Sequence, residues 1–376
     1  LQMYYAEALR LISAQQKLQE ILSSLQKEVF DAYITNPIKA QLPEAFAFAD
    51  APSFMANLHI VLELLHPFKD DPGIHQSLYY MDKIEATAGY ADLDRSDYRA
   101  ATYHFENKLN LALIIDDNLS KRIAYHALGL VQSRLGKKGP AMKLYQKALG
   151  IAGSMGDRYG YAKVLSDIGI LQRQACDYKG AIQSYQKSLE MAIITGNKIQ
   201  QEIILYNFGE LYYQQNDLEK AEEYYYQSLD LAEKLNDNVG VSYATDAIGD
   251  LYYSKGEIDK AEKLYLANFE RQTAIDDAEG LAHTYGNLAN VAKARNQFDL
   301  ANDYYTRNLA LCQRVGDLDG EGRSWYNSAA LEYDMENYSS AMEKLLQAER
   351  CFTEAGSAVY MDMLHELMDQ CRAKMQ

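Results

Sequence analysis

The chain has 376 residues, and its 37 Lys and Arg against 53 Asp and Glu give a formal net charge of −16. This acidic excess argues against a nucleic-acid-binding protein and against docking on anionic lipid, because clustered Lys and Arg hold both kinds of partner. Hydrophobic residues make up 48% of the chain, enough for a packed core, which excludes disorder of the whole chain. No apolar run approaches the ~20 residues of a membrane span, so we expect no membrane partner.

The first 81 residues predict a helical region of their own. Leu1 to about Ile34 has apolar residues at helical spacing and predicts one long helix or a hairpin. Five prolines between Pro37 and Pro72 predict loops around a helix near residues 53–65. The region is a cap, a degenerate repeat or the remnant of an upstream domain. Because the chain begins with Leu and shows no signal peptide, we expect a processed product or a fragment.

Residues 82–361 repeat with a period of forty residues in seven units. Each unit has a small residue, an alanine twelve residues later and a large side chain four residues further on. The small residues are Gly89, Gly129, Gly169, Gly209, Gly249, Ala289 and Ala329, and the large ones are Phe105, Tyr145, Tyr185, Tyr225, Tyr265, Tyr305 and Leu345. The apolar spacing predicts two helices a unit. We expect the small residue to let a neighbouring helix approach and the ring to fill the space between units.

Polar residues separate the predicted helices. Asp177, Asp217 and Asn337 are predicted N-caps of second helices. Between units, pairs such as Gly156-Asp157 predict helix ends and tight turns. We therefore expect the recurring carboxylates at these places to have a turn role and not to form catalytic pairs.

Residues 357–376 predict one amphipathic helix at the end of the array. Asp369 stands where another unit would have its small residue. A stack of repeats needs a last helix with a polar outer face, so we expect this helix to cap the array.

The order of Gly or Ala, then Ala, then Tyr or Phe resembles the tetratricopeptide repeat, whose usual unit has about 34 residues. The longer unit is similar to the variant in Pins/LGN-type scaffolds, kinesin light chain and Rap-type peptide receptors. This resemblance implies an all-α fold, a right-handed α-solenoid of helix-turn-helix repeats whose first helices line a concave face. The proline that closes many repeats of this family is absent. The aromatic residue near the start of the first helix remains only in Tyr125, Tyr285 and Trp325.

Residues for catalysis are sparse. The seven histidines are dispersed, and no metalloprotease, nucleophile-elbow or phosphate-loop motif is present. The four cysteines lack metal-binding spacing and predict reduced thiols in a cytoplasmic protein. We therefore expect no catalytic residues, no metal site, no cofactor and no enzymatic activity of the chain itself.

The resemblance assigns the groove-facing positions to six, three and two residues before the small residue, one after it, and four or five after it. Polar and aromatic side chains recur there in units four to seven, with Tyr243 also among them. The candidate partner-binding residues are Asn207, Asn287, Asn327, Tyr206, Glu210, Tyr213, Asp246, Asp250, Tyr253, His283, Asn290, Lys293, Arg323 and Tyr326.

Asparagine recurs two residues before the small residue, in Asn207, Asn287 and Asn327. Its amide can donate to and accept from a peptide backbone, as such asparagines do in the family that the chain resembles. The alternative is that these residues cap or bond to a neighbouring helix. The tyrosines supply contact area with a hydroxyl group. The acidic centre of the face favours a partner with a cationic segment.

These patterns predict a protein- or peptide-binding scaffold in signalling, which recognises a segment of its partner in the groove. One alternative is a ligand-sensing module of a larger signalling enzyme or transcription regulator. Another is a Rap-like, peptide-regulated phosphatase, which would need a catalytic glutamine in an N-terminal helical bundle. Gln15, Gln16, Gln19 and Gln26 lie on a predicted helix, but no motif selects one of them. The sequence leaves the partner's identity and the oligomeric state open.

Overall fold

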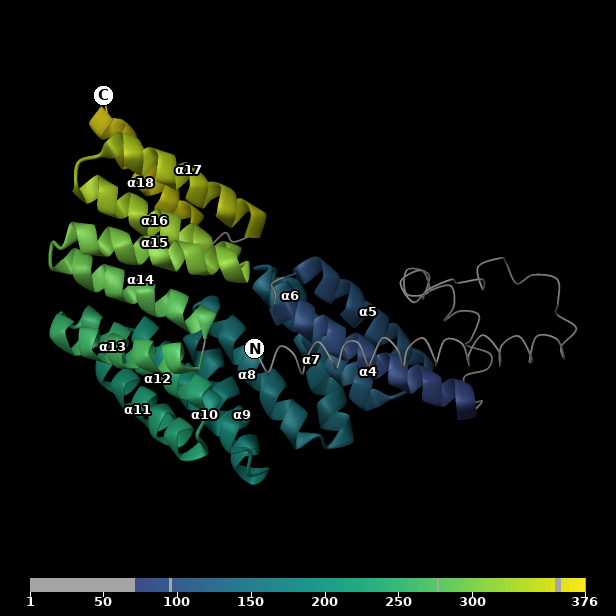
Figure 1. The fold of residues 1–376 in the computed structure, drawn as a ribbon. Helices are drawn as coiled ribbons and strands as arrows, with labels where there is room; N and C mark the ends of the chain where they lie inside the picture. Colours follow the sequence, from purple (N-terminus) through teal and green to yellow (C-terminus); the bar gives the residue numbers. More distant parts are fainter. Residues whose placement is uncertain (1–71, 95–96, 276, 356–359, 376) are drawn as a thin grey trace, which may run out of the picture. The chain divides into compact units, whose positions relative to one another are not determined.

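A computed structural model describes residues 72–94, 97–275, 277–355 and 360–375. These residues form fifteen α-helices and no β-strand, which confirms the all-α prediction (Figure 1). The helix, the loops and the glutamines that were predicted within residues 1–71 lie outside the described residues. None of the described helices is both long and apolar enough to cross a membrane.

The helices follow one another at nearly constant spacing. They are α4 Pro72–Asp94, α5 Tyr98–Ile114, α6 Asn118–Arg134, α7 Lys138–Met155, α8 Arg158–Gln174, α9 Tyr178–Ile194, α10 Lys198–Gln214, α11 Leu218–Leu235, α12 Asn238–Ser254, α13 Ile258–Ala274, α14 Ala278–Ala294, α15 Phe298–Val315, α16 Leu318–Asp334, α17 Tyr338–Ala355 and α18 Met361–Met375. From α6 to α16 the even-numbered helices are the first helices of units, and their starts are forty residues apart. The two-helix unit is therefore confirmed. Pro72, predicted in a loop, is instead the first residue of α4, where a missing N–H costs little.

The chain divides into two compact units. The first unit comprises Leu1–Val131 and Gln146–Met155, and the second comprises Gln132–Tyr145 and Gly156–Gln376. In the second unit α8 to α18 are stacked in chain order (Figure 1).

A buried ion pair joins three helices in the first unit. The ammonium group of Lys108 donates to Asp82 Oδ1 at 2.7 Å and to Ser120 Oγ at 3.3 Å. Lys108 is only 1% exposed, and this burial lowers the pKa of its ammonium group. Breaking such a pair would leave a buried charge without its partner, so the triad ties α4, α5 and α6 together.

Aspartate side chains form the N-caps of most of the helices in the second unit. Asp157 and Asp317 accept from the backbone N–H three residues on at the start of first helices, and Asp177 and Asp217 do so at the start of second helices. The cap predictions for Asp177 and Asp217 are confirmed, whereas the Asn337 side chain donates to Glu332 Oε2 at 3.0 Å. Between units, Gly316 forms a helix C-cap as predicted, whereas Asp157 and Asp317 are N-caps of the following helices.

The recurring tyrosine ring packs inside its own unit. A Cβ added to Gly209 would lie 2.4 Å from Cδ1 of Tyr225, which belongs to the second helix of the same unit. Gly169 and Tyr185 make the same contact, and Tyr185 also meets Phe208 of the next unit with ring centroids 5.3 Å apart. The ring therefore fills the space within a unit as well as the space between units.

A further recurring contact links the two helices of a unit. Ser188 Oγ donates to the carbonyl oxygen of Ala162 at 2.6 Å, and Asn268 Nδ2 donates to that of Ser242 at 3.1 Å. These buried bonds fix the second helix along the first, because each pairs a polar group that would otherwise be unsatisfied.

The helix α18 covers the end of the second unit. Its Leu364, Leu367, Met368 and Cys371 belong to one buried cluster with Phe352 of α17. Asp369, at the position of a small residue, is exposed and pairs with Arg372 at 2.7 Å. An apolar inner face with a polar outer face is what a capping helix requires.

Candidate functional site

Successive first helices meet through side chains at fixed positions of the repeat. The residue three before the small residue contacts the residue six before the small residue of the next unit. Tyr206 and Tyr243 meet in this way with ring centroids 6.2 Å apart, and Asp246 Oδ2 lies 3.2 Å from Nδ1 of His283. The predicted groove positions on α10, α12 and α14 thus form one continuous surface, which we call the first-helix face.

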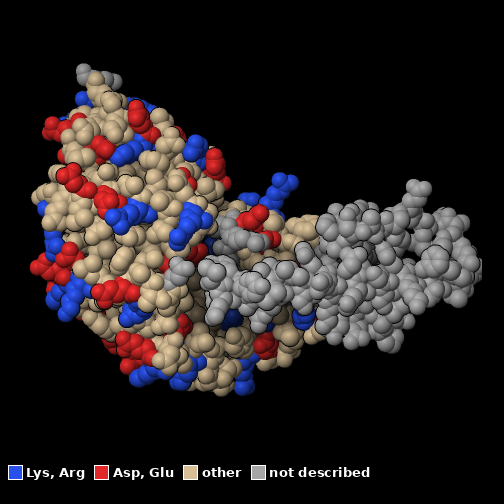
Figure 2. Space-filling model, in the orientation of Figure 1, with Lys and Arg blue, Asp and Glu red and all other residues tan. Residues whose placement is uncertain are grey.

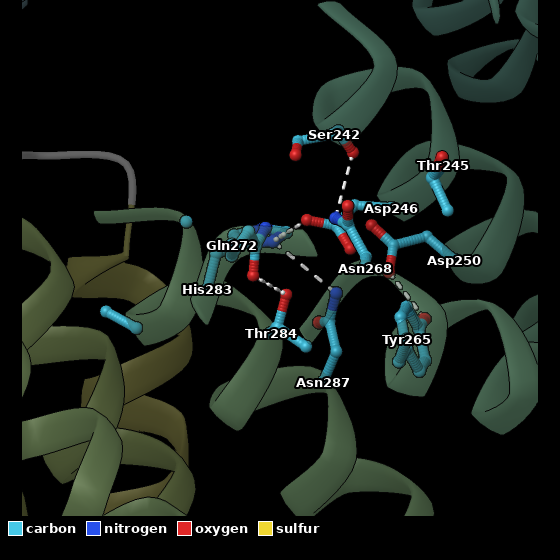
Figure 3. Close-up of polar contacts among 12 residues, drawn as sticks. Ser242, Thr245, Asp246, Asp250, Tyr265, Asn268, Gln272, His283, Thr284 and Asn287 are labelled. Carbon is cyan, nitrogen blue, oxygen red and sulfur yellow. Dashed lines mark hydrogen bonds and ion pairs between the residues drawn. The ribbon is translucent and has the colours of Figure 1, made fainter. Parts of the chain in front are cut away.

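Asp246 is the most deeply buried carboxylate on this face. The residue is 6% exposed, and one carboxylate oxygen, Oδ2, faces the imidazole of His283. The other oxygen, Oδ1, is buried and has no hydrogen-bond partner among the described residues. Figure 3 shows Asp246 with Asp250, His283 and Asn287 around it. An unpaired buried oxygen is costly, so a donor that reached this atom would be stabilised.

His283 on the first-helix face is exposed to solvent and also partly desolvated by its neighbours. The His283 side chain is 46% exposed, yet the surrounding protein desolvates its imidazole, which by itself lowers its pKa. The hydrogen bond to Asp246 and the negative charges of Asp246 and Asp250 together outweigh this effect and raise the pKa overall. Tyr243 is 58% exposed, yet desolvation raises its pKa as well. We call Asp246, Asp250, His283 and Asn287, with Tyr243 beside them, the Asp246 recess.

Asp250 lies one turn further along α12 and is half-buried. Desolvation raises the pKa of its carboxyl group to about 6, although His283 acts against the shift. A carboxyl group with a raised pKa is typical of functional sites, although structural networks produce such shifts too.

A second row of polar side chains accepts hydrogen bonds from the hydroxyl groups of the buried tyrosines. Tyr225 donates to Glu210 Oε1 at 2.7 Å, and Tyr265 donates to Asp250 Oδ1 at 2.7 Å. In the next unit Tyr305 donates in the same way to Asn290 Oδ1 at 2.6 Å. In the last unit the tyrosine is replaced by Leu345 and the acceptor by Ala330. The sequence signal for this structural role is a tyrosine fifteen residues after a polar residue.

The three asparagines have different surroundings. Asn207 is 5% exposed and donates to Ser166 Oγ at 3.2 Å, which is the contact to a neighbouring helix that the sequence left as the alternative. Asn287 is half-buried, and its Nδ2 lies 3.5 Å from Nδ1 of His283. Asn327 is half-buried on α16. Of the three, only Asn287 belongs to the Asp246 recess.

The other predicted residues lie along the edge of the face. Tyr213 shares a hydrogen bond with Ser254, and the hydroxyl group of Tyr253 donates to the backbone oxygen of Asn290 at 3.3 Å. These contacts tie α10 to α12 and α12 to α14.

The charged residues on this edge are paired. Arg173 Nη1 lies 3.4 Å from Glu210 Oε2, and Lys293 Nζ lies 2.8 Å from Asp334 Oδ2. Glu210 is therefore partly neutralised, which leaves Asp246 and Asp250 as the main source of negative charge in the recess.

Two further predicted residues, besides Asn327, lie on α16. The Arg323 guanidinium lies close enough to His283 to oppose the positive charge of the imidazole. Tyr326 packs against the cluster that α18 covers. Arg323 thus borders the recess, whereas Tyr326 contributes to the core.

Acidic and basic side chains alternate over the face that Figure 2 shows, without a large area of one charge. The grouping of acids on α10 and α12 is therefore a local feature. Among the described residues, no group of three or more His, Cys, Asp or Glu is arranged to hold a metal ion.

Comparison with known proteins agrees with the repeat. A tetratricopeptide-repeat family model matches residues 161–234, 200–273 and 240–308, and a second one matches residues 123–154. A search of curated proteins found no significant match by sequence.

Solved structures with the same fold include aspartyl phosphate phosphatase F from Bacillus subtilis, with 14% identity and a TM-score of 0.62 over 94% of this chain and 95% of that chain. A Rap protein complexed with competence and sporulation factor gives 13% identity and a TM-score of 0.62 over 93% of this chain and 98% of that one. A signal transduction ATPase with a tetratricopeptide-repeat sensor, from Pyrococcus horikoshii, gives 12% and 0.53 over 88% and 53%. At these identities the likeness shows the fold. The chain therefore carries tetratricopeptide repeats, in residues 123–154 and 161–308.

Proposed function

We propose that the first-helix face binds a segment of a peptide or protein partner and that a cationic group of this segment contacts Asp246. The observation that carries the proposal is the buried, unpartnered Oδ1 of Asp246 next to the exposed side chain of His283. An ammonium or guanidinium group would supply the missing donor as a charge-assisted hydrogen bond, which is stronger than a bond between neutral groups.

The surroundings of Asp246 support the same ligand. Asp250 adds a second carboxylate one turn away, and the rings of Tyr206 and Tyr243 meet at 63° beside it. Tyrosine rings provide contact area and attract cations to their faces. Asn287, which lies against His283, is the amide best placed for a partner's backbone.

The comparison supports a partner of this kind through the fold. One structure of the same fold is a Rap protein in complex with competence and sporulation factor. Repeats of this class present extended surfaces for partners, so the first-helix face is a natural place for a bound segment.

The test is selection from a random hexapeptide library with the whole chain, followed by affinity measurement of the selected peptides. We expect enrichment of Arg and Lys. Asp246→Asn should weaken binding of a selected peptide at least about ten-fold, because the ligand's charge loses its partner. Asp230→Asn is the matched control, since Asp230 lies on α11 with a side chain 63% exposed.

Both variants should keep the melting temperature of the parent chain within a few degrees. Selection without enrichment of cationic residues, or equal loss of binding in both variants, would contradict the proposal.

A second candidate is a phosphatase that acts on aspartyl phosphate. It is favoured by the similarity to a structure of that name. This similarity covers 94% of this chain, a longer part than the described repeats alone. The glutamines considered for this chemistry lie outside the described residues. Incubation of the chain with a panel of phosphorylated response regulators tests this candidate, and unchanged phosphate lifetimes across the panel would remove it.

A further inference from the structure

One position on the first helices differs among otherwise equivalent repeats. Ten residues before the small residue, α8, α10 and α12 have Tyr159, Ile199 and Val239, with exposed fractions of 49%, 53% and 55%. At the same position α14 has Glu279 and α16 has Asp319. All five helices have 17 residues and start at the same point of the repeat. The fold therefore does not require an apolar side chain at this position.

The apolar choice also runs against the preference of the helix terminus. Acidic residues are favourable in the first turn, where they interact with the helix dipole. The helices α14 and α16 have such residues, whereas α8, α10 and α12 have none. Exposed apolar side chains here cost solvation and bring no gain to the helix, so they point to a role outside folding.

The same contrast recurs one turn further along. Six residues before the small residue, α10 has Ile203 and α12 has Tyr243, which are 40% and 58% exposed. The equivalent residues of α8, α14 and α16 are Lys163, His283 and Arg323, so among these five helices the apolar choice at this position is confined to α10 and α12. The ammonium group of Lys163 lies 5.5 Å from the ring centroid of Tyr159, so we call only Ile199, Ile203, Val239 and Tyr243 the apolar shelf.

The apolar shelf is continuous with the Asp246 recess. Tyr243 contacts Tyr206 and lies one turn before Asp246 on α12. Val239 precedes Asp246 by seven residues, which places it about 10 Å away along the same helix face. Glu279 and His283 on α14 bound the shelf on the other side.

We propose that the apolar shelf is a second subsite for the same segment, which takes a large aliphatic or aromatic side chain while Asp246 takes the cation. The inference rests on the proposed function and defines the partner as an amphipathic segment. A distance of about 10 Å corresponds to about three residues of extended chain. The charge of Asp246 beside an uncharged apolar surface is complementary to such a segment and to no uniformly charged one.

The experiment uses fluorescein-labelled octapeptides with one Arg, a Leu placed one to four residues after it, and Ala elsewhere. Fluorescence anisotropy with the whole chain gives the affinity ratio of each Leu peptide to its Ala counterpart. We expect Leu to improve binding about ten-fold at one spacing, as partial burial of such a side chain predicts. Replacing Arg by Gln in the peptide measures the charge preference separately.

The shelf variant Ile199→Gln/Val239→Gln should bring the Leu-to-Ala ratio close to one and leave the Arg-to-Gln ratio unchanged. Asp246→Asn should have the reverse effect. The matched control is Leu300→Gln/Leu346→Gln, which removes two apolar side chains of similar exposure, 41% and 51%, from second helices. It should change neither ratio.

The outcomes separate the two proposals. An Arg preference without any Leu preference at any spacing overturns the second subsite and leaves the proposed function standing. Loss of both preferences overturns both. If the shelf variant instead converts a dimer to a monomer in sedimentation and leaves peptide binding unchanged, a second copy of the chain occupies the shelf and the inference fails.

Discussion

Asp250 and Asn290 occupy the same position in consecutive units, and each accepts a hydrogen bond from the hydroxyl group of the equivalent tyrosine in its own unit. The two side chains have nearly the same shape, so the chain contains its own neutral counterpart of Asp250. The comparison shows that the hydrogen bond does not need the charge. The negative charge at Asp250 is therefore a cost to folding that the fold itself does not require, as expected for a functional position.

We predict that Asp250→Asn stabilises the chain at neutral pH. The raised pKa, from 3.8 to about 6, means that the folded state binds the proton more tightly than the unfolded state does. Stability from this group is therefore present below about pH 4 and is lost as the pH rises through about 6. The variant should gain about 1–3 kcal/mol at pH 7.5 and nothing at pH 4, measured by urea unfolding.

Asp230→Asn, on the exposed surface of α11, is the control and should show no such pH dependence. If Asp250→Asn is destabilised at pH 7.5, the carboxylate contributes a contact that the Asn290 analogy does not capture.

At the residue scale, side chains at equivalent positions of the repeat have different surroundings. Asn207 and Asn287 have the same offset, but Ser166 on the preceding first helix closes off Asn207. Gly286, which is three residues before its small residue, offers no side chain there. The sequence predicts the position of a side chain within the repeat. The residue about forty positions away, on the neighbouring first helix, determines what that side chain contacts.

The contact between a first helix and its second helix depends on the glycine under the tyrosine ring. Ala289 shares a buried cluster with Tyr305, so one methyl group is accommodated in that unit. In the unit of Gly209 the same methyl group would lie 2.4 Å from Tyr225, so the two helices would have to move apart.

We predict that Gly209→Val destabilises the chain by about 3 kcal/mol and that Gly209→Ala costs less, since overpacking rises with each added carbon. The midpoint of urea unfolding measures both. Gly150→Val on α7 is the control, because a Cβ at Gly150 meets nothing within 4 Å. Equal loss in both valine variants would indicate a helix-propensity effect and not a clash with the ring.

At the scale of the whole molecule, the recess changes its charge near neutral pH. Asp250 titrates at about 6, and the hydrogen bond to Asp246 raises the pKa of His283 above its usual value. As the pH falls from 7.5 to 5.5, Asp250 loses its negative charge and His283 gains a positive one. Both changes act against a bound cation.

We therefore predict that a selected cationic peptide binds about ten-fold more weakly at pH 5.5 than at pH 7.5, measured by fluorescence anisotropy. The double variant Asp250→Asn/His283→Gln should flatten this dependence. A peptide with Gln in place of the cation serves as the control and should show little change with pH. An unchanged affinity for the cationic peptide would place its charge away from this recess.

The sequence by itself determined the period, the two-helix unit and the N-caps Asp177 and Asp217. These features are repeated or local, so each unit provides independent support for them. The partner-binding face stays a prediction, because its positions come from the resemblance to the tetratricopeptide repeat.

The tertiary structure decided which members of that face are open. Asp246 lacks a second partner, and His283 is partly desolvated, because of side chains that successive first helices bring together from about forty residues apart. Ile199 and Val239 of the apolar shelf were missed for the same reason, since an aliphatic residue at helical spacing predicts a core residue unless its exposure is known. Packing between repeats thus turned equivalent sequence positions into different local environments.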